Sequence, residues 1–189
     1  MPACRHDRPG RSWASRCWYP YCGPIGALSV LVARHGGARE VVVADLLDEP
    51  LMVAGRLGAD RTINMAGQPD GLAEYRKDKG TFDVVLEASG AGPAIAAAAA
   101  AARPGGAMVQ IGLGGAETSL PLNIFVAKEL ILRGTFRFHE EFASAVDFIA
   151  QRKIDVRPLL GAVLPVSEVR RAFDLASVRR QSMKVQITF

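Results

Sequence analysis

The segment Cys22-Gly23-Pro24-Ile25-Gly26 constrains the fold of this chain more than any other part of its sequence. Two glycines three residues apart, followed by an apolar helical segment, form the second half of the pattern G-x-G-x-x-G. The first glycine of that pattern would fall at position 21, where this chain has Tyr21. In the complete pattern the turn follows a buried strand, and its amides point from a helix N-terminus at a pyrophosphate. The segment therefore predicts a dinucleotide-binding turn whose first half departs from the pattern.

Short aliphatic runs alternate with helical segments along the rest of the chain. The runs Glu40–Asp45 and Phe82–Glu87 are largely aliphatic, as strands buried on both faces of a parallel sheet are, and each ends in an acid. Further strands are expected over residues 61–64, 107–111 and 130–136, and helices over 27–34, 48–58, 72–79 and 91–102. This alternation predicts an α/β fold, a doubly wound parallel (Rossmann) sheet of about six strands. Its first strand is expected to be defective, because Pro20 would break the ladder of a central strand.

The chain divides into three segments. Residues 1–21 are atypical and are interpreted as a non-native or disordered segment, since they fit neither a strand nor a barrel. Residues 22–157 are expected to form the dinucleotide-binding domain and to end with an amphipathic helix over 140–151. Residues 158–189 are expected to carry a linker over 158–165, a helix over 166–176 and a terminal strand over 183–189.

Charge and composition exclude several function classes. The formal net charge is +4, and residues 1–21 supply most of it. The remainder lacks a basic stripe with interleaved aromatic residues, so we expect no nucleic acid as a partner. No apolar run approaches the ~20 residues of a membrane span, and no secretory signal is recognisable, so we expect no membrane association and a cytoplasmic location. The three cysteines lack metal-ligand spacing, and no metal site is expected.

The strongest candidate binding residues surround the glycine turn. Gly23 would let the backbone approach a pyrophosphate, Gly26 would let the helix pack closely, and the amides after Pro24, those of Ile25 and Gly26, could donate to it. Asp45 follows at the end of the next strand, where a carboxylate can accept hydrogen bonds from an adenosine ribose; the alternative is a helix N-cap. No arginine follows Asp45 closely, which favours NAD over NADP.

Other candidates end later strands. Ser89-Gly90 and the segment from Gly112 through Leu113 to residue 115 could offer bare backbone to a nicotinamide ring, or could be ordinary turns. Arg137 stands between two phenylalanines, where it could bind a substrate carboxylate or simply lie on the surface. No catalytic residue is identified, because the sequence shows no nucleophile motif, no paired carboxylates and no cluster of histidines.

Four blocks in order carry a family resemblance: CGPIGALSVLVARHGG, FDVVLEASG, MVQIGLGG and ELILRGTFRF. With them the sequence from Cys22 to Phe189 resembles the medium-chain, zinc-type polyol dehydrogenases, and RGTFRFHEEFASAV and MKVQITF place it nearest the L-idonate 5-dehydrogenase branch. The resemblance implies NAD-dependent oxidation of a secondary alcohol in a polyol or sugar acid to a ketone, and a homodimer or homotetramer. It also implies that Lys184 lies near the cofactor's pyrophosphate and that Arg137 faces the substrate. The residues that it implies to line the cofactor are Ile25, Gly26, Asp45, Gly112 and Leu113.

Two departures from the family pattern concern the N-terminal side. Family members hold a catalytic zinc in a GroES-like barrel ahead of the glycine turn, and this chain has no room for it, so we expect a truncated protein. Members also carry Gly-Lys-x-Val-Leu-Val before the turn, and a shifted reading frame over residues 13–19 can encode such a strand. We therefore hypothesise a frameshift or a wrong start. A non-catalytic dinucleotide-binding module and a methyltransferase using S-adenosylmethionine are the rival interpretations.

Overall fold

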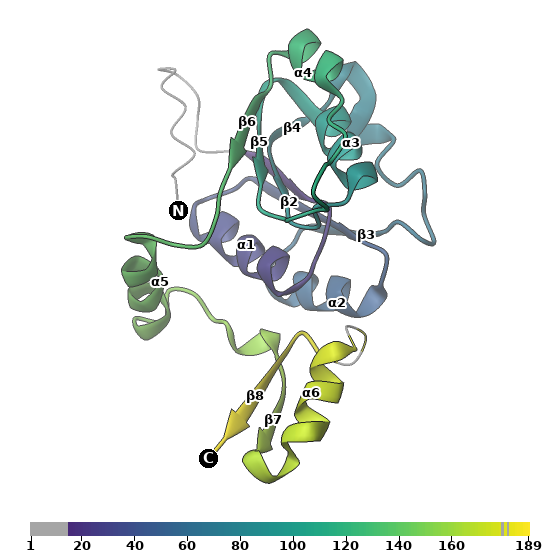
Figure 1. Ribbon diagram of the computed structural model, residues 1–189. Helices are drawn as coiled ribbons and strands as arrows, with labels where there is room; N and C mark the ends of the chain where they lie inside the picture. The colour runs from purple at the N-terminus through teal and green to yellow at the C-terminus, as the bar shows by residue number, and fades with distance from the viewer. Residues whose placement is uncertain (1–14, 179, 181) are drawn as a thin grey trace.

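Aliphatic side chains buried on both faces build the middle of a six-stranded sheet. Val41, Val42 and Val43 are fully buried, and so is Val85 two strands away. β-Branched residues favour the extended backbone that a pleated surface needs. The computed structural model describes residues 15–178, 180 and 182–189 (Figure 1). Its main sheet consists of β1 (Arg16–Tyr19), β2 (Glu40–Asp45), β3 (Arg61–Asn64), β4 (Phe82–Glu87), β5 (Ala102–Gln110) and β6 (Ile131–Gly134).

The strands are all parallel and follow the order β3-β2-β1-β4-β5-β6. In the register, Cys17 of β1 lies opposite Val41 on one side and Val84 on the other. Parallel neighbours need crossover connections, and the intervening helices supply them. The predicted doubly wound parallel sheet of six strands is therefore confirmed.

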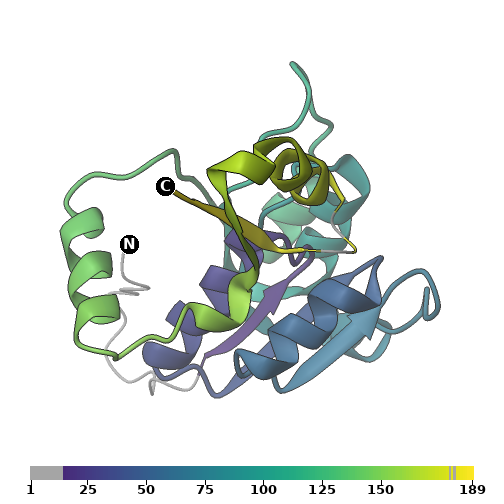
Figure 2. The same cartoon turned by 90° about the horizontal axis from the view of Figure 1, so that it is seen from below.

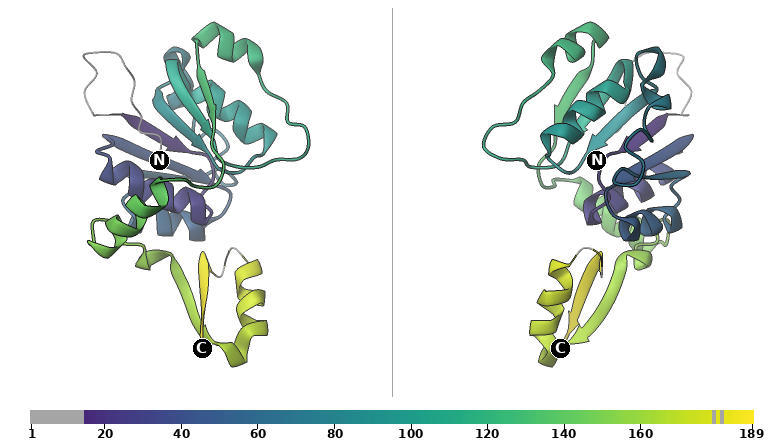
Figure 3. Two further views of the ribbon diagram at one scale, coloured as in Figure 1. Left: turned by 60° about the vertical axis from the view of Figure 1, so that its left-hand side comes forward. Right: turned by 90° about the vertical axis from the view of Figure 1, so that its right-hand side faces the viewer.

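Helices cover both faces of this sheet (Figures 1 and 3). One face carries α1 (Pro24–His35) and α2 (Asp48–Arg56), and the other carries α3 (Gly92–Ala101) and α4 (Leu122–Lys128). Successive side chains of a strand point to opposite faces. Accordingly Cys17 and Tyr19 belong to the core beneath α1 and α2, whereas Trp18 belongs to the core beneath α3.

The first strand is present, contrary to the interpretation of residues 1–21 as lacking a strand. Trp18 and Tyr19 are each 1% exposed, and the Trp18 ring stacks on Phe82 with centroids 5.7 Å apart. The Tyr19 hydroxyl donates to the Ser29 carbonyl oxygen at 3.1 Å. Pro20 follows the last residue of β1, so it removes no hydrogen bond from the ladder. Residues 1–14 lie outside the described part of the chain, and the frameshift hypothesis stays a prediction.

The small side chains of α3 let this helix pack tightly on the sheet, and a lysine binds carbonyl oxygens at the carboxyl end of the helix. Ala98, Ala99 and Ala101 are fully buried. Lys128 Nζ, at the end of α4, donates to the carbonyl oxygens of Ala99, Ala100 and Ala102 at 3.0, 2.7 and 3.0 Å. These carbonyls include ones that a helix leaves unpaired at its end. α4 itself was not expected from the sequence.

The C-terminal residues form a second, smaller unit that projects from the sheet (Figure 3). In it β7 (Leu160–Pro165) pairs in parallel with β8 (Lys184–Thr188), and α6 (Val169–Ser177) packs against both strands. The prediction of a linker over 158–165 is therefore wrong, because that segment finds a strand partner near the chain end. A short 3-10 helix, η3 (Val166–Glu168), leads into α6, and η2 (Arg157–Leu159) precedes β7.

Two further segments differ from expectation in how regular or how buried they are. The helix expected over 72–79 is a kinked 3-10 segment, η1 (Glu74–Lys79), in which Lys77 and Asp78 leave helical geometry. The amphipathic helix α5 (Glu141–Ala150) is present but buries none of its residues, and Figure 2 shows it set off to one side of α1. In the described part of the chain, no helix has the length and apolar character needed to cross a membrane.

Candidate dinucleotide site at the strand ends

The carboxyl ends of β1 and β4 are neighbours at the point where the strand order changes direction. From β1 the chain continues to β2 and β3 on one side of the sheet, and β4, β5 and β6 follow on the other side. In open α/β sheets, ligands bind outside the strand ends at such a switch point. The glycine turn follows β1 and Ser89-Gly90 follows β4, so the fold brings these two predicted segments to the same edge.

The glycine turn starts α1 directly. Gly23 is the residue before the helix, with extended φ and ψ of −70° and −175°, and Pro24 occupies the first helical position. The Ala27 amide donates to the Gly23 carbonyl oxygen at 2.9 Å, which closes the first turn. A Cβ at Gly26 would collide with the carbonyl oxygen of Tyr21. The prediction that Gly26 permits close packing of the helix is therefore confirmed, and the group it packs against is backbone of the preceding segment.

The Tyr21 ring lies against Gly23. A Cβ built on Gly23 would point at the edge of this ring, 2.5 Å from Cε1, 3.2 Å from Cζ and 3.3 Å from the hydroxyl oxygen. The adjoining Cys22 is fully buried, and its Sγ donates to the Pro50 carbonyl oxygen at 3.4 Å. The backbone of the turn is thus held in place, whereas Tyr21 itself is only half-buried.

Asp45, the predicted ribose ligand, ties the end of β2 to the glycine turn. Its Oδ2 accepts a hydrogen bond from the Cys22 amide at 2.8 Å. Its Oδ1 accepts hydrogen bonds from the amides of Leu46 and Leu47 at 2.7 and 3.1 Å, just before α2 begins. The side chain is 4% exposed. Asp45 therefore holds both flanking loops, and ribose binding by its carboxylate stays a prediction.

Glu87 has the corresponding place at the end of β4, and its sequence pattern alone predicted no site role for it. It is fully buried, and its carboxylate accepts hydrogen bonds from the amides of Ser89 and Gly90 at 2.8 Å each and also from the Ser89 hydroxyl and the Gln110 side-chain amide. A buried carboxylate needs such partners to remain inside a fold. The available signal was the acid at the end of an aliphatic run, which Glu87 shares with Asp45.

The glycine loops after β4 and β5 pack backbone to backbone. Gly90 has φ of +72°, and a Cβ there would lie 2.5 Å from the Gly114 amide nitrogen. Beside these loops is a hollow of about 240 Å³, lined by Gly90, Gly112, Leu113 and neighbouring residues. Typical small-molecule pockets measure about 300–1,000 Å³, so this hollow is large enough for only part of a dinucleotide. Ser89 is turned to Glu87 and does not line it.

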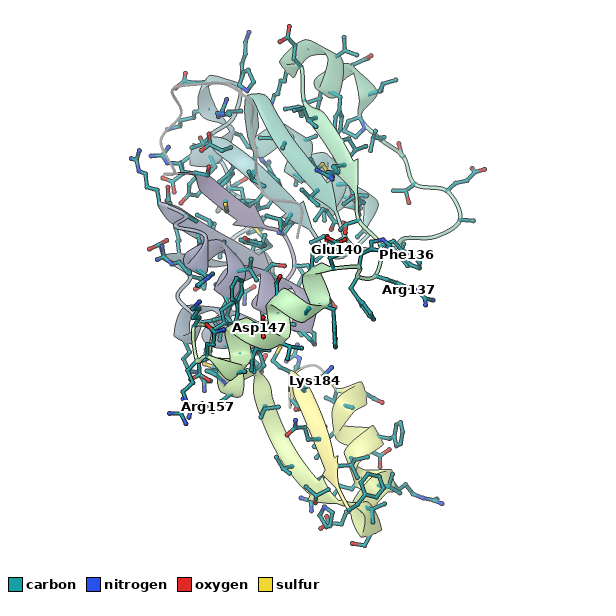
Figure 4. All side chains as sticks on the ribbon, turned by 90° about the vertical axis from the view of Figure 1, so that its left-hand side faces the viewer. Phe136, Arg137, Glu140, Asp147, Arg157 and Lys184 are labelled. Carbon is teal, nitrogen blue, oxygen red and sulfur yellow. The ribbon has the colours of Figure 1, made fainter. Side chains whose placement is uncertain are left out.

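The two remaining predicted residues lie farther along the chain (Figure 4). Arg137 follows β6 with φ of +57°, and its guanidinium lies over the Phe136 ring at 5.1 Å from the centroid. It is exposed and directed away from the ribbon. Lys184 is the first residue of β8, and the preceding Met183 packs on the core beneath α1 and α2. The roles of Arg137 and Lys184 stay predictions.

The groups named here with a shifted pKa lie away from the strand ends. Among them, no group of three metal-ligating side chains lies together. Burial, helped by Glu40, raises the pKa of the Tyr75 hydroxyl, and burial lowers the pKa of Lys128. Hydrogen bonds from Arg157 lower the pKa of Asp155 to about 2. None of these groups lies on the loops after β1, β2, β4 or β5.

A comparison with protein-family models matches residues 24–151 to the zinc-binding dehydrogenase family. L-idonate 5-dehydrogenase (NAD(P)(+)) from Escherichia coli strain K12 is 36% identical over 180 residues, which cover 95% of this chain and 52% of that protein. D-xylulose reductase from Saccharomyces cerevisiae is 32% identical over 171 residues, which cover 87% of this chain and 48% of that protein.

A solved structure has the same fold. The crystal structure of L-idonate 5-dehydrogenase from Escherichia coli superimposes with a TM-score of 0.87 at 36% identity, covering 93% of this chain and 50% of that one. The chain thus spans about half the length of the curated relatives and of the solved structure that it matches.

Proposed function

Because the chain belongs to the zinc-binding dehydrogenase family, we propose that it is the cofactor-binding part of an NAD-dependent oxidoreductase. The reaction would oxidise a secondary alcohol of a polyol or sugar acid to a ketone, as in an L-idonate 5-dehydrogenase. The observation that carries the proposal is the meeting of the glycine turn, Asp45 and the Ser89-Gly90 loop at the switch point of the sheet. The family match also favours this proposal over a methyltransferase.

Residues 22–157 would bind the cofactor, which supplies the hydride acceptor of the reaction. Gly23, Pro24, Ile25 and Gly26 would form the phosphate-binding turn, since α1 is long enough for its dipole to favour an anion there. Asp45 would face the adenosine ribose, and Ser89, Gly112 and Leu113 would lie on the nicotinamide side. Lys184 would lie near the pyrophosphate, and Arg137 would face the carboxylate of a sugar-acid substrate.

The fit to the cofactor and the metal is incomplete in the described residues. The Asp45 carboxylate and the start of α1 suit a dinucleotide, but the Tyr21 ring fills the space beside Gly23. No described group of residues fits zinc. We therefore propose that turnover needs a separate zinc-bearing domain. The matched relatives are about twice as long as this chain, which leaves enough residues for such a domain. We further propose a cytoplasmic location and a homodimer or homotetramer.

Calorimetric titration with NAD, NADP and S-adenosylmethionine tests the binding proposal. We expect NAD to bind more tightly than NADP by roughly tenfold or more, because bringing the 2′-phosphate against Asp45 juxtaposes like charges at a cost of about 1.4 kcal/mol or more. The variant Asp45→Asn should lose most of this preference. Asp48→Asn, an exposed acid three residues on with the same change of charge, is the matched control and should keep it.

A non-catalytic dinucleotide-binding module is the second candidate, favoured by the lack of a metal-ligating group in the described residues. A chimera distinguishes the two. The N-terminal half of the Escherichia coli L-idonate 5-dehydrogenase would be fused ahead of Cys22, and oxidation of L-idonate would be followed by NADH absorbance. Turnover supports the dehydrogenase. A folded chimera that binds zinc and NAD without turnover supports the module.

A further inference from the structure

The space that a dinucleotide's phosphates would use at this turn contains a side chain of the protein itself. In a G-x-G-x-x-G turn the second glycine lacks a side chain so that the backbone can approach the pyrophosphate. Gly23 is that glycine, and the direction of its absent side chain leads to the Tyr21 ring, with Cε1, Cζ and the hydroxyl oxygen 2.5, 3.2 and 3.3 Å from the built Cβ position. The ring therefore covers the face of Gly23 that phosphate oxygens would have to reach.

The backbone around Tyr21 leaves little room for the whole residue to move aside. Its carbonyl oxygen abuts Gly26 in the first turn of α1. The next residue, Cys22, is fully buried, and its amide donates to Asp45 at 2.8 Å. On the other side, Tyr19 is 1% exposed and is the last residue of the central strand. With Tyr19 fixed two residues before it and Cys22 fixed directly after it, rotation of the Tyr21 side chain is the movement that uncovers Gly23.

We propose that Tyr21 occupies the diphosphate subsite of this chain and must rotate out of it before a dinucleotide binds. The inference rests on the proposed dinucleotide-binding function. A site that is open only part of the time binds with an apparent Kd that is raised in inverse proportion to the open fraction. If the ring is rotated out in roughly one molecule in ten to one in a hundred, NAD binds about 10- to 100-fold more weakly than at an open turn.

The test compares NAD binding by the full chain and three Tyr21 variants, using calorimetry. Tyr21→Ala removes the ring and Tyr21→Gly also restores the missing glycine of the pattern, so each should tighten NAD binding at least tenfold. Tyr21→Phe keeps the ring and should bind NAD several-fold more weakly than Tyr21→Ala, because the blockage is steric. Circular dichroism and thermal unfolding establish that each variant is folded.

A second readout measures the unchanged chain, and a variant serves only to assign its signals. The chain has three tyrosines, and with 3-fluorotyrosine incorporated they give three ¹⁹F signals. The signal that Tyr21→Phe removes is that of Tyr21. On saturation with NAD this signal should shift strongly, while that of Tyr75, which is buried beneath α3, stays in place.

The outcomes separate this inference from the proposed function. If the unchanged chain binds NAD as tightly as Tyr21→Ala, or if its Tyr21 signal does not shift on saturation, the inference is overturned and the proposed function stands. If neither the chain nor Tyr21→Ala nor Tyr21→Gly binds NAD at millimolar concentration, both are overturned. Tight binding by Tyr21→Ala and Tyr21→Gly together with weak binding by Tyr21→Phe supports both.

Discussion

Two buried carboxylates organise the strand ends residue by residue. Asp45 joins the end of β2 to the glycine turn, and Glu87 joins the end of β4 to its own loop and to β5. Each carboxylate accepts hydrogen bonds from backbone amides, and such bonds to a charged group contribute about 1.5–3 kcal/mol. Both residues thus shape the loops that would meet a ligand, whether or not they touch it.

Glycine positions in this chain divide sharply between those that need glycine and those that do not. Gly26→Ala should lower the free energy of unfolding by about 1–3 kcal/mol or more, because the new Cβ collides with the Tyr21 carbonyl oxygen. Gly55→Ala, in the last turn of α2, is the matched control. No atom lies within 4 Å of its added Cβ, and alanine should raise stability by about 1 kcal/mol through its better helix propensity. Chemical denaturation measures both, and equal effects would contradict the packing described at Gly26.

At the scale of elements, two segments with weak intrinsic signals, β1 and the carboxyl end of α3, are stabilised by contacts from neighbouring elements. β1 has four residues and no aliphatic side chain, yet it has β2 and β4 as partners and a core on each face. α3 receives at its carboxyl end the ammonium group of Lys128 from α4. A cation there also interacts favourably with the helix dipole.

The link between α3 and α4 can be tested through Lys128. Lys128→Met keeps the length of the side chain but removes three hydrogen bonds to carbonyl oxygens, and it should lower the free energy of unfolding by about 1–3 kcal/mol. The exposed Lys77 on η1 allows the same substitution without such contacts, and Lys77→Met should change stability by less than about 0.5 kcal/mol. Thermal unfolding of the two variants side by side checks this, and similar melting temperatures would refute it.

The elements that could be predicted from the sequence are those whose signal is local. Val41 to Val43 and Val84-Val85 are continuous aliphatic runs, so their burial on both faces was readable. β1 could not be read, because its residues become a strand only between partners that lie far away in sequence. β7 was mistaken for a linker since its partner, β8, follows only after α6. At the site, the positions of Gly26 and Asp45 could be predicted from their spacing in the glycine pattern. The contact of the Tyr21 ring with Gly23 could not, because it depends on the rotamer of a side chain in the folded chain.

On the scale of the whole molecule, one edge of the sheet and one helix remain uncovered among the described residues. β6 is one of the two outer strands, and all four of its residues are exposed, with Ile131 at 50%. α5 buries none of its residues, and its contact with α1 is a ring pair between His35 and Phe148 with centroids 4.5 Å apart. Exposed edges and apolar faces of this kind favour association with another chain.

The proposed homodimer would use this edge, and a charge placed there should disrupt it. Ile131→Lys should shift the sedimentation coefficient from dimer to monomer, because lysine on an edge strand opposes pairing with another strand. Met52→Lys puts the same charge on α2, at a residue that is 57% exposed, and should leave the assembly unchanged. Analytical ultracentrifugation distinguishes the two variants. A monomer before any substitution, or a dimer that tolerates Ile131→Lys, would contradict this use of the edge.

The central place of β1 also affects how the chain can fold as it is synthesised. β1 leaves the ribosome before any other strand of the sheet, yet the Arg16 amide finds its acceptor in the Asp83 carboxylate 67 residues later. Contacts so distant in sequence form slowly, and unpaired strands exposed in the meantime promote aggregation. The nascent chain must therefore keep its future central strand unpaired on one side until β4 emerges. The residues of β1 are therefore synthesised first among the strands but are among the last to complete their pairing. Dependence on chaperones should be greatest while the chain between β1 and β4 is being synthesised.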